Sequence, residues 1–312
     1  MAFTDTTAIS NLVQTAYDKF VLFALRSVPV MRTIADKRVV DQCMPGESIV
    51  FNLYNDLATA PTPLTETVDP TPVAVPDTDT VTVTLNEYGN TTLTTRKLRL
   101  FSFSDIDPAI ANLVAYNQVN TLDEVVRDVL RQGTNVTRLA SGSMTFNTGS
   151  TASVTAGDTM ESQLIRASVA KLRGRSVMPK VGSAYLCLVH PDVSYDLRSE
   201  AGGSATWREP HEQVAPGPIW AGMIGQYEGA VFIETPRTYF AADGDSNAVV
   251  HRSIMVGQQA LAEAVAEEPH IVFGPVVDSL NRMRPVGWYG VLGWARYREQ
   301  AIQRIETSSS LA

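Results

Sequence analysis

The pattern of apolar and polar residues predicts both helices and strands along the chain. Apolar side chains recur at helical spacing in several segments. These are residues 9–24, 121–140, 159–173, 191–199 and 258–266. Thr121-Leu-Asp-Glu124 has the form of a capping box at the start of the second segment, which predicts the longest helix. Gly174 is placed to end the third, Pro191 suits the first turn of the fourth, and Asp105-Ile-Asp-Pro108 indicates a turn or a helix start.

Alternating or continuous apolar runs predict strands elsewhere. These are residues 80–85, 91–103, 184–189, 230–235, 248–256, 270–273, 276–285 and 288–305. In the first run Val81, Val83 and Leu85 share one face, and threonines occupy the other. A turn at residues 88–90 would join this run to the next as a β-hairpin. The mixture of helices and strands predicts an α+β fold.

The stretch around this hairpin carries charge of one sign only. Residues 39–95 contain no Lys or Arg, and their acidic residues are Asp41, Glu47, Asp56, Glu66, Asp69, Asp77, Asp79 and Glu87. Residues 55–76 hold five prolines and too few large apolar side chains to form a core, and proline favours extended backbone. We therefore expect a long acidic hairpin arm that projects from a globular body and grips a neighbouring molecule.

Composition is typical of a globular protein that does not bind nucleic acid tightly. The chain has 312 residues, 44% of them hydrophobic, and a net charge of −8 at pH 7. A prior of about 150 residues per domain suggests roughly two lobes. The acidic balance disfavours binding to phosphates, so contact with DNA would be weak. Arginines outnumber lysines twenty to five, which favours extensive protein contacts.

The sequence also bears on the protein's location and on the state of its cysteines. No apolar run approaches the ~18 residues of a membrane span, and the N-terminus lacks the basic region of a signal peptide. Both features indicate an intracellular protein with no membrane partner. Cys43 and Cys187 have neither metal nor redox spacing, which favours reduced packing thiols.

Arginines recur two residues apart near the C-terminus. The pairs are Arg282 with Arg284 and Arg296 with Arg298. At strand spacing each pair lies on one face, and antiparallel pairing of the two runs would crowd four guanidiniums together. Such an array would need acidic partners, because opposed like charges are destabilising. The alternative is local neutralisation by water or by the carboxylates of Asp278, Glu299 and Glu306.

Catalytic and metal-binding patterns are missing from the sequence. The histidines are His190, His211, His251 and His270, and their spacing favours capping or core roles over metal binding. Residues 243–247 lack the later ligands of a calcium loop and predict a polar turn. The aromatic residues of 288–297 favour sheet packing over a stacking platform for bases. With no phosphate-binding loop or nucleophile motif, we expect no enzyme, no cofactor and no metal.

Three segments resemble major capsid proteins of tailed bacteriophages with the Hong Kong 97 fold. The first is Gly222-Met-Ile-Gly-Gln-Tyr-Glu-Gly-Ala-Val-Phe-Ile-Glu-Thr-Pro236, similar to a glycine-rich segment of one branch of these proteins. The others are His190-Pro-Asp-Val-Ser-Tyr-Asp-Leu197 and the run from Arg284-Pro-Val-Gly-Trp-Tyr-Gly to Arg304-Ile-Glu306. The order of predicted elements resembles the same family over nearly the whole chain.

The resemblance implies a division of the chain. Its parts would be an N-terminal arm (1–56), an extended β-hairpin loop (57–104), a peripheral domain with a long spine helix (105–182 and 267–306), an axial α/β domain (183–266) and a tail (307–312). It also implies a structural protein that self-assembles into hexamers and pentamers of an icosahedral phage head around double-stranded DNA. The capsid would form in the host cytoplasm, with portal, scaffolding and decoration proteins as further partners.

In such a shell the acidic arm would cross a neighbouring subunit. Its contact residues would be Glu66, Asp69, Asp77 and Asp79, with apolar contact from Val81, Val83 and Leu85. The receiving groups would be Arg127, Arg131, Arg282, Arg284, Arg296 and Arg298. Two alternatives stay open at this point: an encapsulin-like nanocompartment shell, which shares the fold, and a β-rich surface adhesin.

Overall fold

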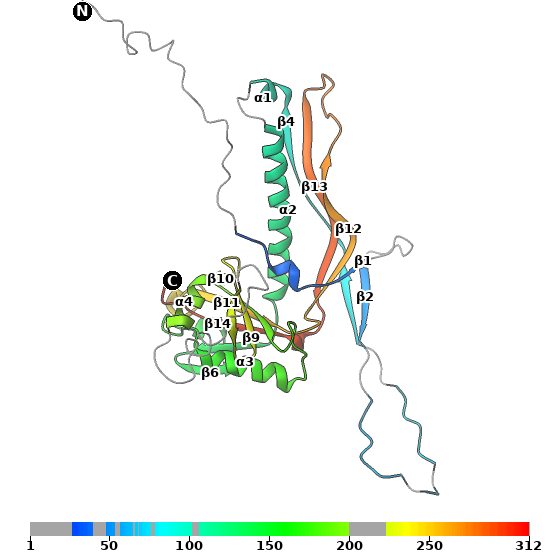
Figure 1. The fold of residues 1–312 in the computed structure, drawn as a ribbon, viewed down its shortest axis with the longest axis vertical. Coiled ribbons are helices and arrows are strands. Elements are labelled where there is room, and N and C mark those ends of the chain that lie inside the picture. The colour runs from blue at the N-terminus through cyan, green and yellow to red at the C-terminus, as the bar shows by residue number, and fades with distance from the viewer. Residues whose placement is uncertain are drawn as a thin grey trace, which may run out of the picture.

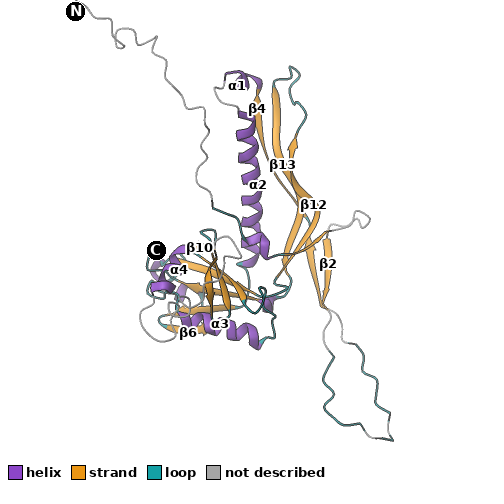
Figure 2. Cartoon of the chain, in the orientation of Figure 1, coloured by secondary structure: helices purple, strands orange, loops and turns teal. Residues whose placement is uncertain are grey.

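The computed structural model describes residues 27–39, 48–53, 57–64, 66–67, 69–75, 79–101, 106–199 and 223–311. Helix 9–24, Cys43, Asp77 and His211, named above, lie outside the described residues. Within them the chain forms an elongated part, a compact lobe and a projecting hairpin (Figures 1 and 2).

The elongated part places one long helix beside a sheet. The sheet has the strand order β1-β12-β13-β4 among the described residues, with β12, β13 and β4 antiparallel and β1 parallel to β12. The elements are β1 (Asp36–Val39), β4 (Asn86–Thr95), α1 (Arg96–Phe101), α2 (Ile106–Leu130), β12 (Leu261–Phe273) and β13 (Met283–Arg296). Helix α2 lies along β13 and β4, and α1 sits at the far end of this part (Figure 1). The long spine helix expected from the resemblance is α2.

The hairpin is built from strands other than those predicted. β2 (Ser48–Leu53) pairs antiparallel with β3 (Asp79–Thr84), with Phe51 opposite Val81. β4 pairs with β13, and residues 88–90 lie inside β4 instead of forming a turn. The predicted pairing of 80–85 with 91–103 is therefore wrong: β3 turns back onto β2, and β4 continues into another sheet. The loop between β2 and β3 extends away from the body (Figure 1).

The compact lobe is a mixed sheet flanked by short helices (Figure 2). Its strand order is β6-β5-β14-β11-β7-β9-β8, with β10 paired to β11, in the part of the chain that the structure describes. The strands are β5 (Val136–Ala140), β6 (Ser143–Phe146), β7 (Tyr185–Val189), β8 (Met223–Tyr227), β9 (Ala230–Glu234), β10 (Phe240–Ala241), β11 (Val250–Val256) and β14 (Ile302–Thr307). The helices are α3 (Ser162–Gly174) and α4 (Pro191–Ser199). Residues 136–146 and 302–307 thus share a sheet with the predicted axial segment, which differs from the division stated above.

Two apolar cores hold these parts together. One joins Leu122, Val126 and Leu130 of α2 to Trp288 and Leu292 of β13, and continues into the lobe through β7 and β11. The other packs α3 and α4 against the lobe sheet, with residues such as Leu164, Val169, Cys187 and Phe232. Burial raises the pKa of the Cys187 thiol, as expected for a packing cysteine. Because the first core is continuous, the elongated part is fixed to the lobe.

Several predicted elements are confirmed. Helices 159–173 and 191–199 correspond to α3 and α4, with Pro191 at the first position of α4. Strands 184–189, 230–235 and 248–256 correspond to β7, β9 and β11. Residues 243–247 form a polar turn that contains a short 3-10 helix, Asp245–Asn247. The aromatic residues Trp288, Trp294 and Tyr297 are buried in sheet packing, as predicted.

The predicted bounds of the longest helix are wrong. α2 begins at Ile106, near the alternative helix start at residues 105–108, and ends at Leu130. Thr121 lies inside it, and its hydroxyl donates a hydrogen bond to the Asn117 carbonyl four residues earlier (2.8 Å) instead of capping an N-terminus. After Leu130 the chain turns at Gly133, and residues 136–140 enter the lobe as β5.

The predicted helix at 258–266 is a strand. Alanine and glutamate favour helices locally, but β12 pairs with β13 on one side and with β1 on the other. Leu261 and Val265 pack into the main core, whereas Ala262 and Ala264 pack under the hairpin. Because both faces of β12 are buried, its sequence lacks the alternation of apolar and polar residues that predicts a strand. Likewise, residues 276–282 form no strand, and 288–305 divides between β13 and β14, which belong to different sheets.

Candidate assembly surfaces

The root of the hairpin is packed against its own chain. Phe51 and Val83 form a small core with Ala262, Ala264 and Tyr297, and the Phe51 and Tyr297 rings meet edge to face with centroids 5.6 Å apart. Strand β3 also crosses β13 closely: a Cβ on Gly293 would lie 2.1 Å from the Thr84 carbonyl oxygen. The direction in which the hairpin leaves the body is therefore set by tight backbone contact.

This packing changes the role expected for the apolar face of β3. Val83 is 0% exposed, and Val81 and Leu85 pack against the same small core. The structure therefore contradicts the expectation that Val83 adds contact to a neighbouring subunit, because its side chain already fills its own hairpin root. Val81, Val83 and Leu85 anchor the arm.

Beyond its root, the arm exposes both acidic and apolar side chains. Glu66 and Asp69 are exposed, and Asp79 is exposed where β3 begins. The exposed apolar residues of this loop are Leu57, Leu64, Val73 and Val75. None of these four belongs to a core cluster among the described residues. The loop is therefore a surface of low internal packing and negative charge, suited to contact with another molecule.

The arginines named as receivers of the arm do not form one array. Arg284 and Arg296 lie near opposite ends of β13, which at ~3.3 Å per residue places them about 40 Å apart. The expected crowding of four guanidiniums is therefore wrong. Arg282 pairs with Asp278 (2.5 Å) and Arg296 with Glu299 (2.8 Å), as the local alternative predicted.

The remaining receivers differ in their freedom to bind a neighbour. Arg127 of α2 pairs with Glu124 (2.8 Å). Arg131, the residue after α2, pairs with Asp128 (3.0 Å), and its guanidinium lies 4.1 Å from the centre of the Tyr239 ring. Arg284 and Arg298 are exposed and form no ion pair among the described residues. These two are the arginines best able to accept a carboxylate from outside the chain.

An exposed apolar cluster, here called the apolar tip, lies at the far end of the elongated part. Its residues are Leu98, Leu100, Phe101, Phe273, Val277 and Leu280. The Arg96 amide donates to the Arg282 carbonyl (2.7 Å), which holds the start of α1 against the β12–β13 connection. Phe101 is 78% exposed. Sequence reasoning missed this surface because residues 91–103 read as one strand, although the run Leu98 to Phe101 was a signal of exposed apolar area.

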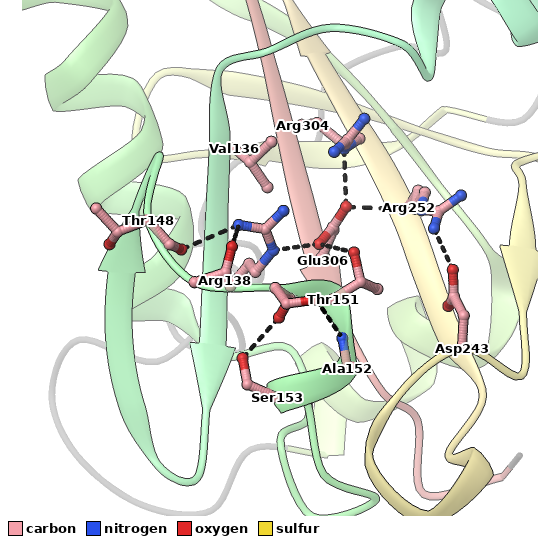
Figure 3. A network of polar contacts seen from close by, with 12 residues as sticks. Val136, Arg138, Thr148, Thr151, Ala152, Ser153, Asp243, Arg252, Arg304 and Glu306 are labelled. Carbon is pink, nitrogen blue, oxygen red and sulfur yellow. Dashed lines mark hydrogen bonds and ion pairs between the residues drawn. The ribbon is translucent and has the colours of Figure 1, made fainter.

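A buried carboxylate organises the lobe sheet (Figure 3). Glu306 on β14 is 0% exposed, and its oxygens pair with Arg138 on β5 (2.5 Å), Arg304 on β14 (2.9 Å) and Arg252 on β11 (3.6 Å). The hydroxyl of Thr151 donates a further hydrogen bond to it (3.1 Å). Glu306 therefore neutralises arginines of the lobe, not the C-terminal pairs to which the sequence had assigned it. One acceptor holds three adjacent strands.

A comparison with protein families shows which family the chain belongs to. A family model described as phage capsid protein matches residues 4–310. The chain belongs to the phage capsid protein family. This family is structural, and the prediction of a tailed-phage major capsid protein is confirmed. The nanocompartment and adhesin alternatives are not favoured.

Solved capsid structures match this capsid protein over nearly its whole length. The capsid of Ralstonia phage GP4 has a TM-score of 0.76 at 15% identity, with 96% of each chain covered. The capsid of cyanophage P-SCSP1u has a TM-score of 0.71 at 12% identity, covering 97% of this chain and 95% of the other. A chain of Mycobacterium phage Che8 has a TM-score of 0.66 at 15% identity, covering 97% and 98%. The predicted Hong Kong 97-like capsid fold is confirmed.

Two further searches found no match to a curated protein and no membrane-spanning helix in the part of the chain that the structure describes. None of the curated proteins matches it significantly. Among the described residues, none of the helices combines the length and apolar character needed to cross a membrane.

Proposed function

We propose that this capsid protein assembles into hexamers and pentamers that close an icosahedral phage head around double-stranded DNA. The observation that carries the proposal is the arm: its root is anchored in its own chain, whereas its loop exposes carboxylates and apolar side chains that its own chain does not cover. A surface of this kind is stabilised when a copy of the same chain covers it. Self-association of this family is supported by the assembled capsids among its structural neighbours.

The arm contact is proposed to be electrostatic and repeated. Glu66, Asp69, Asp77 and Asp79 would face guanidiniums of a neighbouring subunit. We place Arg284 and Arg298 first among the receivers, because Arg127, Arg131, Arg282 and Arg296 already have internal carboxylate partners. Each exposed pair contributes only about 0–1 kcal/mol. Repetition around a closed shell adds these terms, and charge complementarity fixes the register of neighbours.

The apolar tip is proposed as a second contact between subunits. It lies at the end of the elongated part opposite the hairpin (Figure 1). Exposed apolar groups of this size gain roughly 25 cal/mol for each Å² removed from water. A copy of the same tip, or the sheet of another subunit, would cover it in the shell.

Replacement of Leu100 and Phe101 by serine tests this second contact. Because both side chains are already exposed, the variant should keep the wild-type melting temperature of the unassembled subunit while the yield of closed particles falls. Light scattering and electron microscopy report the particles, and circular dichroism reports the melt. The control is Met178→Ser, an equally exposed apolar residue of the lobe. Wild-type particle yields from the tip variant would refute this contact.

Electron microscopy of the purified full-length protein tests the function itself. Closed shells of uniform diameter with pentamers at their vertices are the expected result. A protein that stays monomeric across salt and concentration, also when co-expressed with the neighbouring phage structural genes, would overturn the proposal. Portal, scaffolding and decoration proteins are further proposed partners, with assembly in the host cytoplasm. The net charge of −8 supports only weak contact with packaged DNA.

A further inference from the structure

Three metal-ligand side chains converge at one end of the lobe sheet. β7 and β11 are antiparallel neighbours. His190 directly follows β7, Asp192 is the second residue of α4, and His251 is the second residue of β11. One ligand atom from each residue lies within 4.8 Å of the others. The fold thus brings together histidines whose spacing in the sequence gave no metal-binding signal.

One distance in this cluster matches the separation of two ligands on a bound ion. His190 Nδ1 and Asp192 Oδ2 are 3.1 Å apart. Two ligands on a tetrahedral ion with bonds of ~2.0–2.1 Å are separated by roughly 3.3 Å. The His190 and His251 rings have centroids 4.7 Å apart, and the Phe240 ring lies 5.4 and 5.5 Å from them. Rotation of the His251 ring would complete a three-ligand set beside this aromatic wall.

His251 provides the second, independent observation. It is 2% exposed, and neither of its ring nitrogens has a hydrogen-bond partner. A buried polar group without a hydrogen-bond partner lowers the stability of the fold by about 1–3 kcal/mol. A ligand bound to the His251 ring would remove this cost.

The surrounding carboxylates favour a cation without competing to bind it. Asp196 accepts hydrogen bonds from the Ser310 amide and hydroxyl. Glu234 accepts a hydrogen bond from the Ser194 hydroxyl (3.0 Å). Both act on the histidines through charge. Asp192 is part-exposed, so the site opens to solvent on its side.

We propose that His190, Asp192 and His251 bind one divalent transition-metal ion, with Zn²⁺ the ion that two imidazoles and one carboxylate fit best. Water would complete the tetrahedron on the open side. The ion would tie the start of α4 to β11, and so fix one edge of the lobe. This site is independent of the arm and tip contacts.

Isothermal titration of the full-length, chelator-treated protein with ZnCl₂ tests the site. The expected result is one Zn²⁺ per chain and a higher melting temperature. His190→Gln and Asp192→Asn, both at part-exposed positions, should each lower the affinity by about 100-fold or more, beyond the loss typical of outer-shell changes. His270→Gln and His211→Gln are the matched controls and should bind as wild type. Co²⁺ in place of Zn²⁺ should give the visible absorption of a tetrahedral site, which the same two variants remove.

Two outcomes would overturn the proposal. One is a folded wild-type protein that takes up no Zn²⁺. The other is uptake that His190→Gln and Asp192→Asn leave unchanged, which would place the ion elsewhere. Because circular dichroism shows whether each variant is folded, a lost site is distinguished from a lost fold, and the buried His251 need not be altered.

Discussion

Glu66→Lys combined with Asp69→Lys should give folded subunits that do not close into shells. Both side chains are exposed on the arm, so their reversal leaves the core of the subunit intact. In the shell, attraction to a neighbour's arginine would become repulsion at every copy of the contact. A change of about 1.4 kcal/mol per contact lowers its association constant about tenfold, and many such contacts act together. Sedimentation and electron microscopy measure the particles, and circular dichroism measures the fold.

The controls separate charge from shape. Glu66→Asp with Asp69→Glu keeps both charges and should assemble as wild type, whereas Glu66→Gln with Asp69→Asn should give an intermediate yield that depends less on salt. If the lysine variant forms normal particles at physiological ionic strength, the electrostatic role of the arm is wrong. Asp77→Lys with Asp79→Lys applies the same test to the two acidic residues at the C-terminal end of the loop sequence.

A compensating change would identify the receiver. Arg284→Glu or Arg298→Glu, added to the lysine arm, should restore particles only if that arginine faces Glu66 or Asp69. Each reversal alone should lower the particle yield. Restoration by Arg282→Glu instead would show that its bond to Asp278 opens during assembly.

The sequence predicted the arm correctly but not its strands. Charge and proline content over residues 39–95 are local properties, and they were sufficient to indicate a projecting acidic segment. The partner of β3 is a long-range property: β2 lies on the far side of the loop, and nothing in residues 80–95 excludes a hairpin with β4. The close approach of Gly293 to Thr84, which fixes the crossing of β3 over β13, has no signal in the local pattern.

The same limit explains which site residues were found. Arg282 and Arg296 were recognised by spacing, and their carboxylate partners Asp278 and Glu299 lie within four residues of them, so the sequence could name these pairs. His190 and His251 are brought together only by the pairing of β7 with β11. Alternation within β12 was concealed because the hairpin covers one face and α2 the other. Interactions between residues close in sequence could be predicted from the sequence, whereas contacts between distant strands could not.

Glu306→Gln should be the most destabilising single polar change in the lobe. Three guanidiniums meet this carboxylate, and it is fully buried. Breaking a buried ion pair by removal of one partner costs about 3–5 kcal/mol, because the other charge stays buried and uncompensated. Urea unfolding of the subunit, carried out in the assembly-deficient arm variant to keep it monomeric, measures this loss.

The loss of stability should depend on whether the shared carboxylate or one of its arginine partners is replaced. Arg304→Gln leaves Glu306 with Arg138 and Arg252, so its cost should be about 1.5–3 kcal/mol, the range for a hydrogen bond to a charged group. Asp243 pairs with Arg252 at the edge of the network, and its side chain is 38% exposed. Asp243→Asn should therefore lower the free energy of unfolding by less than about 1 kcal/mol. The expected order is therefore Glu306→Gln, then Arg304→Gln, then Asp243→Asn. Equal losses for the first and third would mean that the three strands are held by backbone pairing and apolar packing, with no special role for the shared acceptor.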